Sequence, residues 1–150
     1  MLKKILITTL LLNLAACSSN VKEEIQSSKP SHKHHAKSEE IKLKAKLYFD
    51  YDSSSLSAQG RSILKNNAKW LKANNNAKLT IEGHCDERGS REYNIALGER
   101  RAYAVKNYLN SLGINNSRLK AISYGEEKPA SSGSSESSFR KNRRAEFKLR

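Results

Sequence analysis

The sequence predicts a two-layer α/β sandwich of the α+β type, with helices on one face of a mixed sheet and the element order β-α-β-α-β-β. Three of the four expected strands alternate polar and apolar residues, which is typical of strands with one face on a core and one in water. Two helical segments separate the first three strands, and such connections pack helices against a sheet through right-handed crossovers. Strands of a doubly wound sheet would be continuous apolar runs instead.

The first half of the folded region contains a strand, a helix and a second strand. Residues 42–50 alternate between apolar side chains and mostly lysines, as a half-buried strand does. After a turn, residues 57–73 carry apolar side chains at helical spacing. Three asparagines at 74–76 end this helix, and residues 79–84 alternate again as a second strand.

The second half predicts a long helix and two more strands. A loop at 84–89 follows the second strand, and Ser90 is a favourable N-cap for a helix that runs to about Leu112. The remaining segments are a third strand, a Ser- and Glu-rich loop and a last strand, at 118–125, 126–139 and 145–149.

Length and charge limit the possible functions. The chain has 150 residues, with 28 Lys and Arg against 15 Asp and Glu, and a formal charge of +13. Residues 41–150 hold 22 of these basic and 11 of these acidic residues, so this region alone carries +11. The length suits one domain with an appendage and excludes a (β/α)₈ barrel or a two-domain enzyme. The positive charge favours an anionic partner such as a nucleic acid, an anionic lipid or an anionic polymer.

The N-terminal residues predict an export signal with a lipid attachment site. A basic start precedes a mostly apolar run at 5–16, which is too short to span a membrane and is typical of a secretory signal peptide. A buried N-terminal helix is the alternative. The Leu-Ala-Ala-Cys sequence that ends at Cys17 resembles the lipobox of bacterial lipoproteins, which implies cleavage after residue 16 and covalent lipid on Cys17. Ser18, in place of the Asp that retains such proteins in the inner membrane, then implies the outer membrane.

A flexible tether is expected between this lipid and the domain. Residues 18–40 hold four Lys and four Glu and too little apolar surface to form a core. Metal binding is one interpretation of the three histidines in this segment, and a solvated basic tract is the simpler one, because nothing fixes a ligand geometry there. These histidines are His32, His34 and His35. The expected organisation is a signal peptide at 1–16, a lipidated tether at 17–40 and one domain at 41–150.

The chain contains no familiar catalytic motif. A phosphate-binding loop, a nucleophile elbow, a dinucleotide fingerprint and a spaced Cys/His zinc pattern are all missing from the sequence. His84 and Cys85 are adjacent on an extended segment, so their side chains point to opposite faces and do not form a nucleophile pair. We therefore expect neither an enzyme nor a metal site. Export and lipidation also argue against a nucleic-acid partner.

One charged side chain interrupts an otherwise apolar helical stripe. Arg101 shares a face of the second helix with Leu97, and burying its charge is unfavourable without a partner. Asp86 lies just after the second strand and just before that helix. The spacing allows an internal ion pair between Asp86 and Arg101, or a pocket that offers one acid and one guanidinium to a zwitterionic ligand.

The stretch IEGHCDERGSREYNIALGERRA at 81–102 resembles the family of peptidoglycan-binding domains found in the OmpA C-terminal region and in the peptidoglycan-associated lipoproteins. The similarity covers roughly residues 44–150. It includes LYFD at 47–50, SYGEEKP at 123–129 and NRR at 142–144. Gly98 stands where the broad family pattern has Ser.

This resemblance implies a ligand, a site and partners. The implied ligand is peptidoglycan, held non-covalently through the meso-diaminopimelate of its stem peptide. Asp86 would accept from the ligand's amine and Arg101 would grip its carboxylate, ideally as a bidentate fork, while Phe49, Asp50 and Leu97 line the pocket. The implied second partner is TolB of the Tol-Pal system, with a role in envelope integrity and cell division. Apart from the lipid on Cys17, no cofactor is implied.

Overall fold

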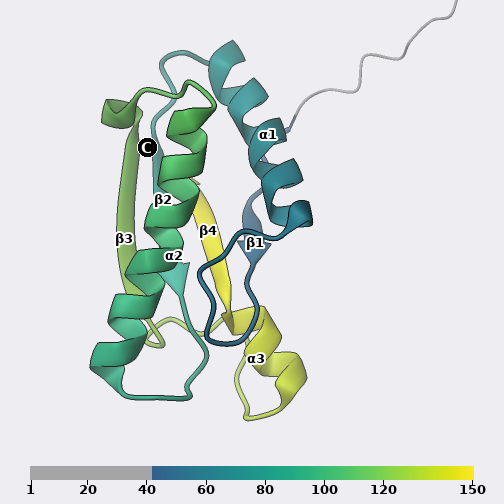
Figure 1. Cartoon of the computed structure of the whole chain (residues 1–150), viewed down its shortest axis with the longest axis vertical. Helices are drawn as coiled ribbons and strands as arrows, with labels where there is room; N and C mark the ends of the chain where they lie inside the picture. The colour runs from purple at the N-terminus through teal and green to yellow at the C-terminus, as the bar shows by residue number, and fades with distance from the viewer. Residues whose placement is uncertain (1–41) are drawn as a thin grey trace, which may run out of the picture. The chain divides into compact units, whose positions relative to one another are not determined.

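The computed structural model describes residues 42–150, which contain four strands and three α-helices (Figure 1). The strands are β1, β2, β3 and β4, at Lys46–Tyr48, Leu79–His84, Leu119–Gly125 and Arg144–Leu149. The helices are α1, α2 and α3, at Ala58–Ala73, Arg91–Ser111 and Glu136–Asn142, with a 3₁₀ turn at Asn116–Arg118. None of the helices within residues 42–150 is long and apolar enough to cross a membrane. The predicted signal peptide, Cys17 and the tether histidines lie outside the described residues.

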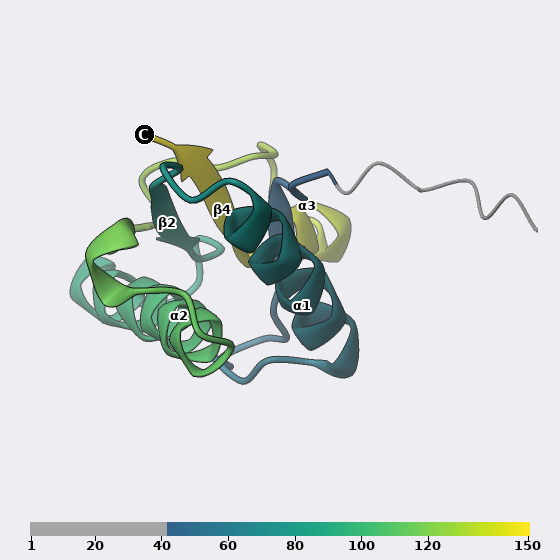
Figure 2. The same ribbon diagram turned by 90° about the horizontal axis from the view of Figure 1, so that it is seen from above.

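The four strands form one mixed sheet in the order β1-β4-β2-β3. β2 runs parallel to β3, whereas β4 lies between β1 and β2 and runs antiparallel to both. Both long helices, α1 and α2, lie on the same face of this sheet (Figure 2). The predicted two-layer sandwich with a mixed sheet is therefore confirmed.

Two elements differ from the sequence-based expectation. Helix α3 begins inside the segment predicted to be a loop, and Ser135 caps it by accepting a hydrogen bond from the Ser138 amide at 3.2 Å. Phe139 is its one buried apolar residue, and a single residue cannot reveal a helical period. β1 is shorter than the predicted strand at 42–50, because only three of its residues pair with β4 in regular register.

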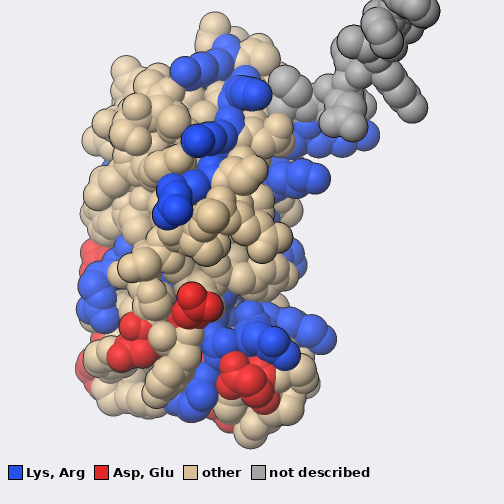
Figure 3. All heavy atoms as spheres, turned by 45° about the vertical axis from the view of Figure 1, so that its right-hand side comes forward, with Lys and Arg blue, Asp and Glu red and all other residues tan. Residues whose placement is uncertain are grey.

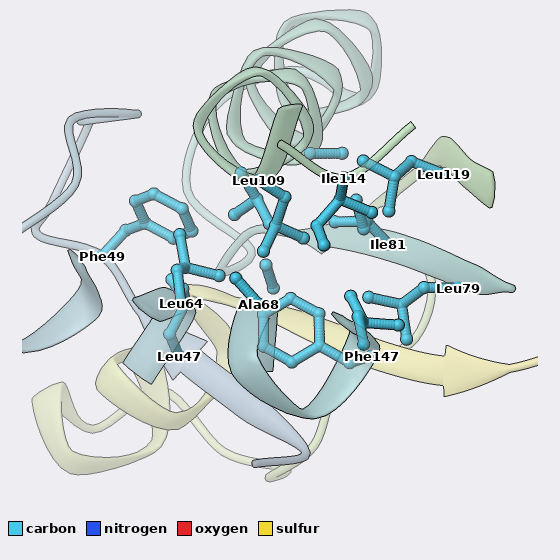
Figure 4. Close-up of a cluster of buried hydrophobic side chains, with 14 residues drawn as sticks. Leu47, Phe49, Leu64, Ala68, Leu79, Ile81, Leu109, Ile114, Leu119 and Phe147 are labelled. Atoms are coloured by element: carbon cyan, nitrogen blue, oxygen red, sulfur yellow. The ribbon is translucent and has the colours of Figure 1, made fainter. Parts of the chain in front are cut away.

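The hydrophobic core lies between the sheet and the two long helices (Figure 4). Ile81 of β2, Leu64 of α1 and Leu109 of α2 all contribute, and none of the three is exposed to solvent. Leu79 and Ile81 point inward together, as the alternation in the second strand predicts. The core thus unites the elements that carry the predicted site residues.

At one point β2 and α2 approach so closely that only glycine fits at position 83. A Cβ atom added to Gly83 would lie 1.9 Å from the carbonyl oxygen of Gly98. This contact sets the start of α2 against the end of β2. It therefore fixes how Asp86, just after the strand, lies relative to Arg101 on the helix.

The side chains of β2 that point away from the core are more buried than expected, because the sequence alternation predicts that this side of the strand faces water. His84 is only 1% exposed, and its ring stacks on that of Tyr124 with the ring centroids 5.6 Å apart. Neither ring nitrogen of His84 has a hydrogen-bond partner among the described residues. The Glu82 carboxylate lies 3.9 Å from Nε2, beyond hydrogen-bond distance, so burial is the larger influence and disfavours the charged form of the ring.

We expect the free energy of unfolding to fall by about 3 kcal/mol as the pH drops from 6.5 to 4, because of His84. Burial first, and then the positive charge of Arg144, lower the pKa of His84 from 6.5 to about 4. The unfolded chain takes up this proton at a higher pH than the folded chain, so the stability is complete above pH 6.5 and is lost toward pH 4.

Urea unfolding measured across this pH range tests the expectation, with His84→Phe as the comparison. Phenylalanine keeps the ring contact with Tyr124 but cannot titrate, so the variant's stability should change much less between pH 6.5 and pH 4.5. Glu146, whose pKa is lowered to about 2, contributes mainly below that range. An equally steep pH dependence in the variant would contradict the assignment to His84.

Candidate functional site

Three predicted site residues line one cavity at the end of the sheet. The cavity has a volume of about 290 Å³ and is lined by Asp86, Leu97 and Arg101, among others. It forms where the loop after β2 meets the first turns of α2 and the segment that follows β1. This end of the sheet is at the bottom of Figure 1, where α2 begins.

The other two predicted residues, Phe49 and Asp50, line an adjoining hollow of about 430 Å³. The Arg143 side chain lines both spaces, and its Nε donates to the Phe49 carbonyl at 3.2 Å. The turn that follows β1 therefore separates the cavity from the hollow.

Asp86 is buried and its carboxylate is fully engaged by arginines. One oxygen accepts from the Arg88 amide and from Arg88 Nε, both at 3.1 Å. The other accepts from Arg88 Nη2 at 2.7 Å and from Arg143 Nη1 at 3.1 Å. Burial alone would raise the pKa of Asp86, but these hydrogen bonds outweigh it and hold the pKa below its ordinary value. The carboxylate is thus an anion at neutral pH.

Arg101 is fully buried, and backbone carbonyls surround its guanidinium. Nε donates to the Ser53 carbonyl at 2.8 Å, Nη1 to the His84 carbonyl at 2.8 Å and Nη2 to the Asp50 carbonyl at 3.0 Å. Nη1 also reaches Cys85 Sγ at 3.4 Å. Burial lowers the pKa of Arg101, but an arginine keeps its charge in proteins. Carbonyl dipoles therefore solvate this charge without neutralising it.

The internal ion pair that the spacing allows between Asp86 and Arg101 is not formed. Among residues 42–150, the partners of Asp86 within ion-pair distance are Arg88 and Arg143, and no carboxylate pairs with Arg101. The reason is geometric, because Arg101 already meets carbonyls from both sides of the cavity. Four of its five N–H groups have acceptors, which leaves one on Nη2. A bidentate fork from Arg101 to a ligand therefore requires one carbonyl to be released.

Sequence reasoning missed the two arginines that hold Asp86. The Arg88 guanidinium stacks between the rings of Tyr51 and Phe139, at 4.1 and 4.4 Å from their centroids. Its side chain is 33% exposed, whereas that of Arg143 is only 5% exposed. Arg143 stands 57 positions after Asp86 in the chain, so no local spacing connects them. Both arginines do occur within motifs of the family resemblance, and that was the one available signal.

The cavity combines both signs of charge with a small positive excess. Arg88, Arg101 and Arg143 line it together with Asp52 and Asp86, so the formal charge of the lining is +1. Figure 3 shows Asp and Glu gathered with Lys and Arg in the lower part of the molecule, whereas basic side chains predominate higher up. Such a lining suits a ligand that carries an amine and at least one carboxylate.

The remaining polar groups near the cavity do not form a catalytic set. Cys85 points toward Arg101 and His84 stacks on Tyr124, so the two side chains diverge as predicted. Burial raises the pKa of the Cys85 thiol despite the neighbouring guanidinium, which makes it a poor nucleophile. Residues 42–150 contain no cluster of three or more His, Cys, Asp or Glu side chains that could hold a metal ion.

Comparison with known proteins gives consistent similarities across this region. The family model described as "OmpA family" matches residues 48–143, a range that includes every predicted site residue except Cys17. A protein of Pseudomonas putida named peptidoglycan-associated lipoprotein is 50% identical over 113 residues, which cover 74% of this chain and 68% of the relative. One of the same name from Agrobacterium fabrum is 48% identical over 100 residues, which cover 67% of this chain but only 56% of the relative.

Solved structures share the fold. The crystal structure of the peptidoglycan-associated lipoprotein from Burkholderia pseudomallei has 41% sequence identity and a TM-score of 0.70, and the similarity covers 71% of this chain and 91% of that one. The C-terminal domain of Helicobacter pylori MotB has 22% identity and a TM-score of 0.66, covering 70% of this chain and 83% of that domain. At that identity the second similarity concerns the fold alone.

Proposed function

The chain belongs to the OmpA family, and we propose on this basis that it is an outer-membrane lipoprotein that binds peptidoglycan non-covalently. The membership confirms the family resemblance. It also confirms the prediction that the chain is a binding protein and not an enzyme. The shared name of the curated relatives, peptidoglycan-associated lipoprotein, supports the assignment to the cell envelope.

The proposed ligand is the free end of meso-diaminopimelate in the stem peptide. This end carries an ammonium and a carboxylate on one carbon. One observation supports this ligand most directly: a buried carboxylate and a buried, un-neutralised guanidinium line the same cavity. Asp86 accepts from the ligand's ammonium, and the positive charge of Arg101 attracts its carboxylate. Leu97 and the backbone of the Phe49–Asp50 turn line the space beside it.

Binding then requires an exchange of partners at Asp86. Its four hydrogen bonds come from Arg88 and Arg143, so an incoming ammonium has to replace one of them. We expect Arg88 to move, because its side chain is 33% exposed whereas that of Arg143 is 5% exposed. Its movement breaks its stacking on Tyr51 and Phe139 as well. This exchange costs free energy. It therefore favours ligands whose carboxylate interacts with Arg101 at the same time, because that interaction offsets the cost.

The wider role that we propose is a tether between membrane and wall. Lipid on Cys17 would hold the chain in the outer membrane, with the domain facing the periplasm, and the domain would hold the wall. In this role the protein acts within the Tol-Pal system, with TolB as its protein partner, in envelope integrity and cell division. Cys17 lies outside the described residues, so the support for the lipid comes from the sequence and from the relatives' names.

We expect Asp86→Ala to abolish most co-sedimentation of the protein with purified wall sacculi at moderate salt. The substitution makes the protein more positive, so adhesion driven only by charge should persist or strengthen. A cavity that recognises an ammonium should instead lose its acceptor. The two explanations therefore predict changes of opposite sign in the bound fraction.

Glu87→Ala is the matched control. It removes the same charge from the same loop, but Glu87 is exposed, and its one side-chain hydrogen bond within residues 42–150 is accepted from Ser134. This variant should bind like the parent. Circular dichroism of the Asp86 variant checks its fold, because Arg143 loses a partner. A folded Asp86→Ala variant that still co-sediments fully would show that Asp86 is structural and would overturn the proposed recognition.

A further inference from the structure

We propose that the hollow beside the cavity is a second subsite, which binds the carboxylate-bearing residue of the stem peptide that adjoins the diamino acid. This inference rests on the proposed function and extends it from one ligand residue to two. The hollow has a volume of about 430 Å³, which lies within the range of small-molecule sites. Its walls come from the end of β1, the start of α1 and the last turn of α3.

The charge of the hollow favours an anion. Arg140 and Lys141 line it, both are exposed, and neither has an ion-pair or hydrogen-bond partner among the described residues. Asp50 is the one acidic residue in the lining. The third basic residue, Arg143, already has Asp86 and Glu136 as partners. Two cations without partners against one carboxylate leave a net attraction for a negatively charged group.

An aromatic side chain offers a contact surface next to these cations. Tyr48 lines the hollow and is 49% exposed, although it belongs to a strand. Large exposed aromatic residues are enriched at binding surfaces, because they bury much area while losing few rotamers. The hollow therefore offers both a surface for packing and a charge for recognition.

The position of the hollow identifies its occupant. The turn after β1 is the wall shared with the cavity, and arginines of the cavity bind that wall through its carbonyl groups. Arg143 donates to the Phe49 carbonyl at 3.2 Å and Arg101 to the Asp50 carbonyl at 3.0 Å. Because the two spaces share this wall and Arg143, a peptide whose diamino acid enters the cavity can direct its neighbouring residue toward the hollow. In peptidoglycan that neighbour is a glutamate linked through its side chain, so its α-carboxylate is free to meet Arg140 and Lys141.

Calorimetry with the full-length protein tests this subsite with three ligands. They are free meso-diaminopimelate, the tripeptide Ala-isoglutamate-diaminopimelate, and the same tripeptide with the glutamate α-carboxylate amidated. We expect the acidic tripeptide to bind about fivefold tighter than the amidated one at moderate salt. The double variant Arg140→Ala/Lys141→Ala should lose this preference and leave the affinity for free diaminopimelate unchanged.

The double variant Lys65→Ala/Lys69→Ala provides the charge-matched control. Both lysines are exposed on α1 and line neither the cavity nor the hollow, so this control should keep the fivefold preference. Equal binding of the two tripeptides by the parent would overturn the subsite. Loss of the fivefold preference in the control variant would also overturn the subsite, because the attraction would then come from the overall positive charge of the domain. If the parent binds none of the three ligands, the proposed function itself fails, which is a distinct result.

Discussion

Replacing Arg101 with alanine is expected to lower the free energy of unfolding by about 3–5 kcal/mol and to abolish binding to peptidoglycan. The change removes a fully buried side chain and leaves three backbone carbonyls, those of Ser53, His84 and Asp50, without their donor. These carbonyls lie on two different segments, so Arg101 holds the turn after β1 against the end of β2. Such a loss is a large share of the stability of a typical domain.

Urea unfolding at equilibrium measures the first effect, and sedimentation with sacculi measures the second at a temperature where the variant stays folded. Arg100→Ala is the matched control, because Arg100 is the exposed neighbour on the same helix and its one described contact is with the Tyr93 ring, at 5.7 Å. The control should stay within about 0.5 kcal/mol of the parent and bind normally. An Arg101→Ala variant as stable as the parent would contradict the structural role.

Replacing Gly83 with alanine is expected to cost about 3 kcal/mol or more and to disrupt the site without touching any residue in it. The added Cβ would lie 1.9 Å from the Gly98 carbonyl oxygen, and that oxygen belongs to helix backbone that cannot rotate away. The helix must therefore move off the strand. Because Asp86 follows β2 and Arg101 lies on α2, this movement separates the two charges that the ligand needs.

Gly60→Ala distinguishes this steric effect from a general intolerance of glycine replacement. Gly60 lies in the first turn of α1, and an added Cβ would meet its nearest atom, Ser57 Oγ, at 3.4 Å. Alanine favours helix by about 1 kcal/mol over glycine, so this variant should match or exceed the parent's stability. Both variants are compared by urea unfolding and by sedimentation with sacculi. If Gly83→Ala unfolds like Gly60→Ala, the close approach does not matter for stability.

The sequence was sufficient for the elements with a repeating pattern. The strands at 79–84 and 144–149 follow from alternation and the two long helices from helical spacing, because each has enough residues to display its period. The third strand, predicted at 118–125, lies at 119–125. Helix α3 has one buried apolar residue and no readable period. The depth at which His84 is buried was also unreadable, because its cover comes from Tyr124 on another strand.

The candidate site likewise has features that the sequence predicts and features that it does not. The residue order alone predicts that Asp86 follows a strand, that Arg101 interrupts an apolar stripe, and that both lie in the motif of one family. Their partners become visible only in the folded chain: Arg88 and Arg143 bind the carboxylate, and carbonyls of distant segments bind the guanidinium. This is because periodicity records which face of an element is buried. It carries no information about which distant polar group arrives there, and that depends on how the chain closes on itself.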